Sequence, residues 1–260
     1  MRAITFFGAL LSLIGVAGLA RAHDLWTSAD SPAAGEPFKL IVGYGHHFPA
    51  WEPIPAEEYP FFKVKLVGPS GEIPLLPAEP NYAWVTESAV PAGTYLAVAD
   101  VEPIFWTSTP DGWSMKPLNE TPGGVSCGLY VESAKGVANV GALADPAAVS
   151  VPVGLPLEII PLANPATVKP GGPLPLKLLW RGEPLAGAPV YARYAGLEEI
   201  AGSPEARAFY GLTDRDGLVT VVPTVDGEWI VTARAEKPFD DPSRCAKEDY
   251  GTSLHFQILP

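Results

Sequence analysis

Short hydrophobic runs that alternate with turn residues make up most of the chain. Prolines and glycines, 30 and 26 in number, interrupt the sequence along its whole length. Short runs of apolar, β-branched and aromatic residues between such breaks are typical of strands, and proline disfavours helices. The pattern therefore predicts an all-β fold. The expected strands are 38–42, 61–67, 93–99, 127–131, 157–160, 174–180, 189–194, 217–222, 228–234 and 253–259.

The character of the pattern changes near residues 145–156, and we take this segment as a domain boundary. We expect residues 23–150 to form an amino-terminal β domain and residues 151–260 a carboxy-terminal β-sandwich. The regular spacing of the later strands is typical of immunoglobulin-like or transthyretin-like sandwiches. We expect residues 103–124 to be an irregular loop, because they are rich in proline and glycine, and residues 198–208 to contain one or two helical turns.

The first 22 residues have the pattern of a secretory signal peptide. Arg2 provides a short basic head, a long apolar run follows, and Ala20-Arg21-Ala22 has the small-x-small form of a cleavage site. The sequence thus predicts cleavage after Ala22 and a periplasmic or secreted protein. No later apolar run approaches the length that spans a bilayer, so we expect no membrane insertion of the mature chain.

The charge balance argues against nucleic acid as a partner. The formal net charge is −12, and cleavage of the signal peptide would remove two arginines and make it more negative. An acidic surface repels phosphate backbones and is compatible with attracting cations. Cys127 and Cys245 are the only cysteines. In an oxidising compartment we expect them to form a disulfide, with two buried free thiols as the alternative.

His23 is the most informative of the four histidines, because the predicted cleavage would make it the first residue of the mature chain. Its α-amine and imidazole have pKa values of about 8 and 6.5, so both can lose their protons near neutral pH. The amine nitrogen and Nδ1 can then chelate one ion. Such a nitrogen-rich donor set suits Cu(II) or Ni(II) better than Ca(II) or Mg(II).

A second group of candidate ligands lies in the segment GYGHHFPAWE, residues 43–52. Adjacent residues on a strand point to opposite faces, so we favour His46 as a ligand with His47 as the second choice. His255 alternates with apolar neighbours, and we expect it on a solvated strand face. Weaker oxygen ligands are available nearby, namely Asp24, Tyr44, Glu52, Glu57 and Glu58.

The sequence gives little support for catalysis. The Gly-x-Ser-x-Gly elbow and the phosphate-binding glycine loops are absent, and no serine or cysteine has a recognisable nucleophile setting. We therefore expect that the protein is not an enzyme. We expect the aromatic side chains that could cover a site or bind a sugar face to pack in the sandwich cores instead; they are Trp26, Trp51, Trp84, Trp106 and Trp113.

Six further sequence segments can be compared with known families: HDLW (23–26), GYGHHFP (43–49), LEIIPLANP (157–165), GEPLAGAPV (182–190), TDRDG (213–217) and GEW (227–229). Together they resemble a periplasmic domain-of-unknown-function family that is associated with nickel and cobalt uptake and often labelled NikM-like. The resemblance implies a metal-binding accessory of an inner-membrane metal transporter. It also implies that His23 and His46 lie at the metal, while the doubled His46-His47 departs from the family pattern.

Three hypotheses about function follow from the sequence. The first is a periplasmic protein that binds Ni2+, with Co2+ and Cu2+ as alternatives, at His23, His46 and His47. The second is a copper-dependent oxidative enzyme, because an amino-terminal histidine resembles the copper site of secreted polysaccharide monooxygenases. The third is a metal-free envelope or adhesion protein in which the histidines are incidental.

Overall fold

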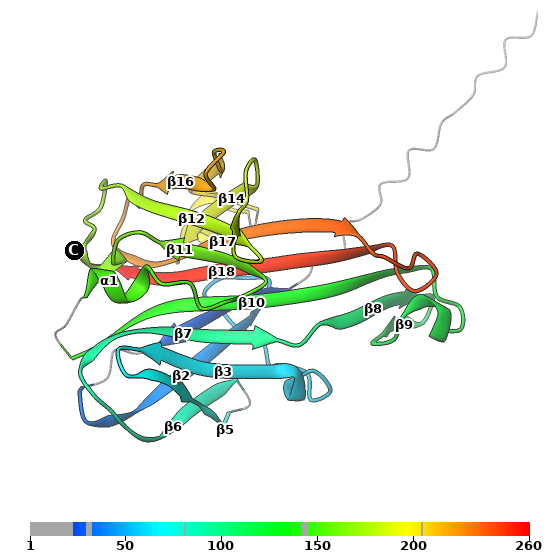
Figure 1. The fold of residues 1–260 in the computed structure, drawn as a ribbon, viewed down its shortest axis with the longest axis horizontal. Helices are drawn as coiled ribbons and strands as arrows, with labels where there is room; N and C mark the ends of the chain where they lie inside the picture. Colours follow the sequence, from blue (N-terminus) through cyan, green and yellow to red (C-terminus); the bar gives the residue numbers. More distant parts are fainter. Residues whose placement is uncertain (1–22, 30–32, 81, 142–144, 204) are drawn as a thin grey trace, which may run out of the picture.

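The computed structural model describes residues 23–29, 33–80, 82–141, 145–203 and 205–260. The predicted signal peptide, residues 1–22, lies outside the described residues, so its cleavage stays a prediction. In the described part of the chain, strands dominate and the helices are short (Figure 1). No helix there has the length and hydrophobicity that crossing a bilayer requires.

The elements of the amino-terminal half are β1 (Asp24–Ala29), β2 (Glu36–Gly45), η1 (Tyr59–Phe61), β3 (Phe62–Gly68), β4 (Gly71–Pro74), β5 (Leu76–Ala78), β6 (Ala83–Val90), β7 (Gly93–Val101), β8 (Ile104–Thr109), β9 (Gly112–Ser114), η2 (Leu118–Glu120) and β10 (Ser126–Val140). Those that follow are α1 (Pro146–Val149), β11 (Leu157–Pro161), η3 (Pro165–Thr167), β12 (Leu174–Trp180), β13 (Glu183–Pro184), β14 (Pro189–Tyr194), α2 (Leu197–Ala201), β15 (Phe209–Leu212), β16 (Leu218–Val221), β17 (Gly227–Pro238) and β18 (Lys247–Ile258).

The strands form three sheets that make two β-sandwiches. The largest sheet runs in the order β15-β14-β17-β18-β10-β7-β3-β4, with β8 and β9 attached beside β10. A second sheet, β1-β2-β6-β5, packs against its β3, β7 and β10 side, and a third sheet of β11, β12, β13 and β16 packs against its β14, β17 and β18 side. The prediction of an all-β fold with two sandwiches is confirmed.

The two smaller sheets lie on opposite faces of the large one, as the alternation along β10 shows. Ala134 and Ala138 belong to the core beneath β2 and β6. On the other face, the Ser133 hydroxyl donates to the Leu157 carbonyl in β11. Since successive side chains of a strand point to opposite faces, β10 contributes to both sandwich cores. The domain boundary near residue 150 stays a prediction, and the largest sheet contains strands from both sides of it.

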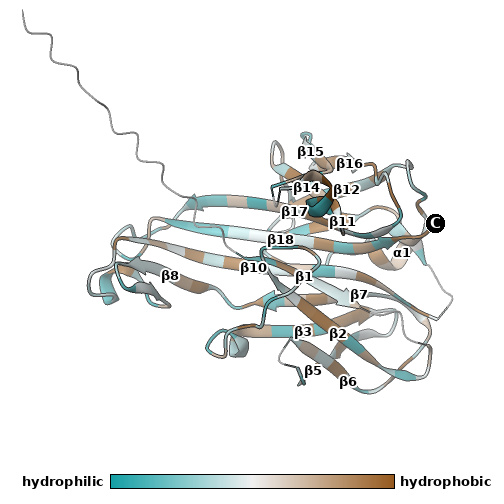
Figure 2. Ribbon diagram, turned by 180° about the vertical axis from the view of Figure 1, so that it is seen from behind, coloured by the Kyte–Doolittle hydropathy of each residue, from teal (hydrophilic) through white to brown (hydrophobic). Residues whose placement is uncertain are grey.

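Hydrophobic positions concentrate where the sheets face one another. Figure 2 shows hydrophobic stretches in the middle of β2 and along β11, whereas the ends of β17 and β18 far from α1 are mostly hydrophilic. These ends extend beyond the cover of the third sheet (Figure 1). The exposed ends are held by ion pairs, such as that between Lys247 and Glu236 at 2.8 Å.

The expectation that residues 103–124 form an irregular loop is wrong. Strands β8 and β9 pair with each other, and β8 also pairs with β10. The four prolines of this segment, Pro103, Pro110, Pro117 and Pro122, stand outside the strands. A proline next to a strand leaves the ladder hydrogen bonds intact, so it marks a strand end and not a loop throughout.

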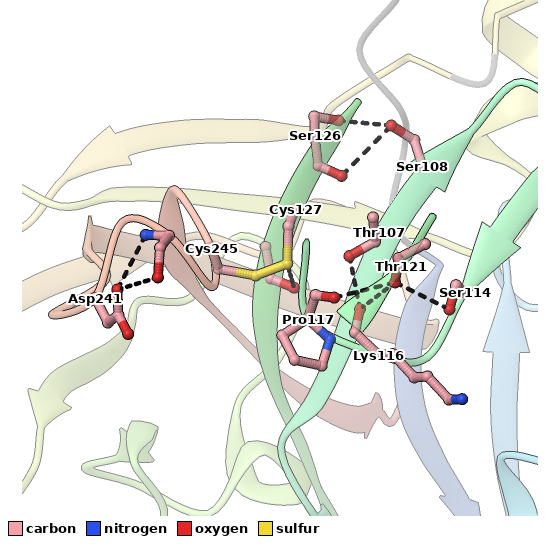
Figure 3. The surroundings of a disulfide bond; sticks show 12 residues. Thr107, Ser108, Ser114, Lys116, Pro117, Thr121, Ser126, Cys127, Asp241 and Cys245 are labelled. Carbon is pink, nitrogen blue, oxygen red and sulfur yellow. Dashed lines mark hydrogen bonds between the residues drawn. A yellow bond between two sulfur atoms is a disulfide. The ribbon is translucent and has the colours of Figure 1, made fainter. Parts of the chain in front are cut away.

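Cys127 and Cys245 form the predicted disulfide (Figure 3). The bridge joins the beginning of β10 to the loop before β18, and its Cα atoms are 4.8 Å apart. The backbone N–H of Ala246 donates to the Cys127 carbonyl at 3.1 Å, so the two segments are also linked by the main chain. Both cysteines are buried.

Removal of the disulfide is expected to destabilise the protein. The two cysteines are 118 residues apart, and releasing so long a loop increases the entropy of the unfolded chain. The variant Cys127→Ser/Cys245→Ser should lose about 4 kcal/mol of unfolding free energy, measured by urea denaturation. The wild type in reducing buffer should match the variant; an unchanged midpoint in both would contradict the prediction.

Candidate metal centre

The pairing of β1 with β2 places His23 opposite His46. Asp24 pairs with Gly45 and Leu25 with Tyr44 in an antiparallel register. One further step along this register puts His23 across from His46, just beyond the last paired residues. Cross-strand neighbours lie about 5 Å apart at Cβ, and the two ring centroids are 4.3 Å apart.

Glu52 reaches the two histidines because the chain reverses after β2. The backbone N–H of Glu52 donates to the Tyr44 carbonyl at 2.6 Å and closes the loop. Its Oε1 lies 3.0 Å from Nδ1 of His46, and its Oε2 lies 3.7 Å from Nε2 of His23. Gly45 permits this approach, because a Cβ there would lie 2.9 Å from Oε1 of Glu52.

His23, His46 and Glu52 form the one cluster among the described residues in which three potential metal ligands converge. One donor atom of each lies within 4.8 Å of the other two. Imidazole nitrogen with carboxylate oxygen is a donor set for first-row transition metals. The side chains are 32%, 33% and 47% exposed, respectively, so an ion could enter and leave from solvent.

The surroundings favour the metal-binding protonation states of His23 and Glu52. Burial lowers the pKa of His23, and the neighbouring His46 lowers it further. The hydrogen bond with His46 holds the pKa of Glu52 below its usual value. A neutral imidazole and an ionised carboxylate are the protonation states that bind a metal ion. Near neutral pH, His23 and Glu52 are therefore in the forms that ligation requires.

The structure does not bring His47 to the pair. Its Nδ1 lies 2.8 Å from Oε1 of Glu198 in α2, in the carboxy-terminal half of the chain. The alternation that turns His46 toward His23 turns the next side chain away. Of the oxygen ligands that the sequence offers, Glu52 alone belongs to the cluster. The loop closure that selects it has no signal in the spacing of the residues.

The expectation of a solvated His255 is wrong, because only 6% of this residue is exposed. Its ring lies against Phe48, with centroids 5.9 Å apart, and its Nε2 is 3.9 Å from a Glu228 oxygen. Strand β18 is covered on this face as well: the hydroxyl of the neighbouring Ser253 donates to the Leu25 carbonyl in β1. His255 is thus a core residue outside the cluster.

His23 also lines a cavity of about 320 Å³. Residues from both sheets of the amino-terminal sandwich line it. They are His23, Leu25, Tyr44, Glu58, Phe62, Val101, Ile104, Trp106, Trp113, Tyr130 and Glu132. Spacing along the chain does not group these residues, because the sequence pattern predicts a loop where the β8–β9 hairpin supplies both tryptophans.

Glu132 is one of the two glutamates that line this cavity, and its pKa is raised. Burial raises the pKa of Glu132 to about 7, although the Arg234 guanidinium, 3.2 Å away, acts in the opposite direction. A carboxyl group whose pKa is raised by burial is destabilised in its charged form. Near neutral pH this group is therefore divided between its two protonation states.

A family model described as "Domain of unknown function (DUF4198)" matches residues 20–237. No curated protein sequence matches the chain.

Several solved structures resemble this chain, with low sequence identity and low TM-scores. The D0-D1 domain of intimin is 13% identical, with 90% of this chain and 97% of that chain covered and a TM-score of 0.22. A two fibronectin type-III domain segment from chicken tenascin is 10% identical, with the same coverages and a TM-score of 0.20. A Salmonella alpha-2-macroglobulin mutant is 12% identical, with 96% of this chain and 16% of that chain covered and a TM-score of 0.22. TM-scores this low support no inference about function.

Glu132→Gln is expected to change how stability depends on pH. The pKa of Glu132 is raised from 4.5 to about 7 in the folded protein, so the unfolded chain releases this proton first. The wild type should therefore lose stability relative to the variant as the pH rises from 4.5 through 7, by up to about 3 kcal/mol.

Urea denaturation from about pH 4 to about pH 8 measures this difference. Glu87→Gln, at an exposed position, should keep the pH profile of the wild type. A difference between Glu132→Gln and the wild type that stays constant with pH would contradict the prediction.

Proposed function

The chain belongs to the DUF4198 family of domains of unknown function, and on that premise we propose that it binds one divalent transition-metal ion outside the cytoplasm. The convergence of His23, His46 and Glu52 is the observation that carries the proposal. Two imidazoles and one carboxylate leave coordination positions open on a tetrahedral or octahedral ion. Such an open, partly exposed site suits an ion that is exchanged better than one that holds the fold together.

The proposal also covers the identity of the ion. Imidazole suits nickel, copper, zinc and iron, and the affinity of most nitrogen and oxygen sites rises toward copper. Nickel is placed first because of the resemblance to proteins associated with nickel and cobalt uptake, with cobalt and copper next. The acidic chain, of formal charge −12, adds a general attraction for cations. Delivery of the ion to an inner-membrane transporter is the role that this resemblance suggests.

Removal of the signal peptide would add a further donor, the α-amine of His23. An amine chelate uses Nδ1 of the same residue, whereas Nε2 of His23 is the atom that lies 3.7 Å from Glu52. The ring would therefore have to turn if the amine and Nδ1 held the ion together. Two modes of binding follow: one uses the rings and Glu52 alone, and the other includes the amine.

The ligand variants His23→Ala, His46→Ala and Glu52→Gln should each lower the Ni(II) affinity of the mature protein at least about tenfold, because each removes a donor or its charge. Isothermal titration calorimetry with NiCl2, CoCl2 and CuCl2 measures the affinities and the stoichiometry, expected to be about one ion per chain. His47→Ala is the matched control, since its ring contacts Glu198.

Two outcomes would contradict the proposed site. If the mature wild type bound none of the three metals, the protein would be the metal-free sandwich of the third hypothesis. If His47→Ala lowered the affinity as much as His46→Ala did, the ion would lie elsewhere. Circular dichroism of each variant shows whether the fold is retained.

An added alanine before His23 separates the two modes of binding. In the mode that includes the amine, the extension converts the amine into an amide, and binding should fall at least about tenfold because an amide nitrogen is a poor ligand. In the mode that uses the two rings and Glu52, affinity should stay unchanged. We expect the loss for Cu(II) and Ni(II), the ions that the amine chelate suits. Equal affinities of the extended and mature proteins would exclude the amine.

A further inference from the structure

The cavity beside His23 is mainly aromatic. Its rings come from five strands, β2, β3, β8, β9 and β10, so both sheets of the amino-terminal sandwich contribute. They are Tyr44, Phe62, Trp106, Trp113 and Tyr130. A volume of about 320 Å³ is at the lower end of the range for small-molecule sites. The faces of aromatic rings carry partial negative charge and attract cations, most strongly in tryptophan.

Both acidic residues that line the cavity are glutamates, and among the described residues no lysine or arginine lines it. Glu132 has a cationic partner in Arg234. Glu58 is different, because none of the ion pairs among the described residues includes it. It is 6% exposed, and its Oε2 accepts a hydrogen bond from the neutral Tyr44 hydroxyl at 2.8 Å. A buried carboxylate without a cationic partner is costly.

The raised pKa of Glu58 is consistent with the lack of a cationic partner. Burial raises the pKa of Glu58, while the Tyr44 hydrogen bond acts against the rise and the adjacent Glu57 adds to it. A cation in the cavity would supply the missing positive charge. An anionic ligand would instead face two carboxyl groups, and a neutral apolar ligand would leave Glu58 unpaired.

We propose that this cavity binds a small organic cation, an alkylammonium or quaternary ammonium compound, with Glu58 as counter-charge and the aromatic rings around the cationic group. The apolar part of such a ligand would cover the side chains of Leu25, Val101 and Ile104, which also line the cavity. Of the three candidate metal ligands only His23 lines the cavity, and the proposed counter-charge, Glu58, lies outside the metal cluster. The inference therefore does not rest on the proposed metal-binding function.

The test compares choline with its neutral isostere, in which a tert-butyl group replaces the trimethylammonium group. Calorimetry with the mature wild-type chain after metal removal by EDTA should show binding of choline, with the isostere at least about tenfold weaker. Because the two probes have the same shape, the difference reports the charge alone. The same result is expected with His46→Ala, which removes a metal ligand but leaves the cavity intact.

The charge of Glu58 is tested by a matched pair of variants. Glu58→Gln keeps the size and a hydrogen-bond acceptor for Tyr44, and it should lower choline affinity about tenfold while leaving that of the isostere unchanged. Glu57→Gln changes the net charge equally at an exposed neighbouring position and should leave choline affinity unaltered. Equal affinities of the wild type for both probes, or no binding of choline, would overturn the inference. So would an equal loss in Glu57→Gln and Glu58→Gln.

Discussion

Strands β10 and β18 pair in parallel, from Gly128 opposite Lys247 to Gly136 opposite His255, and this pairing joins the strands of both sandwiches into one sheet. Because β10 contributes alternate side chains to two cores, neither core is complete without it. A buried ion pair lies at the junction, where Lys135 Nζ is 2.7 Å from Glu158. Burial lowers the pKa of Lys135. An arrangement that separated Lys135 in β10 from Glu158 in β11 would leave two buried charges unpaired, which is costly. The pair therefore favours one arrangement of the large sheet and the sheet that contains β11.

The candidate metal centre depends on the same sheet. Strand β1 lies close against β10, and Gly136 permits this approach. A Cβ at that position would lie only 2.6 Å from the Thr27 carbonyl oxygen. The Thr27 hydroxyl donates to the Ala97 carbonyl in β7, and the Ser253 hydroxyl donates to the backbone of β1. These contacts fix β1 over the middle of the sheet. His23, one residue before β1, is thereby held at the edge of the sandwich, where β2 brings His46 beside it.

Local patterns in the sequence predicted more of the fold than of the site. Hydrophobic alternation located most strands, and the two cysteines could be paired by compartment chemistry alone. Alternation cannot tell whether a second layer covers a face, so it predicts a solvated His255, although β1 covers β18 there. The pairing of His23 with His46 depends on the register of β1 and β2. Glu52 depends on a loop closed by one main-chain hydrogen bond. Neither the register nor the hydrogen bond is encoded in residue spacing.

Tyr44 explains why the acidic residues near the histidines divide into two groups. Its ring stacks on His23, with centroids 4.3 Å apart, and its hydroxyl donates to Glu58. Burial and the nearby Glu58 raise the pKa of Tyr44 far above its usual range, so it stays a neutral phenol and not an anionic ligand. Glu52 lies with the histidines, and Glu58 lies in the cavity. Tyr44 contacts both His23 and Glu58, so the two proposed sites are neighbours. Cations bound at both sites would repel each other because they carry like charges. By linkage, each cation would then lower the affinity of the other by the same factor.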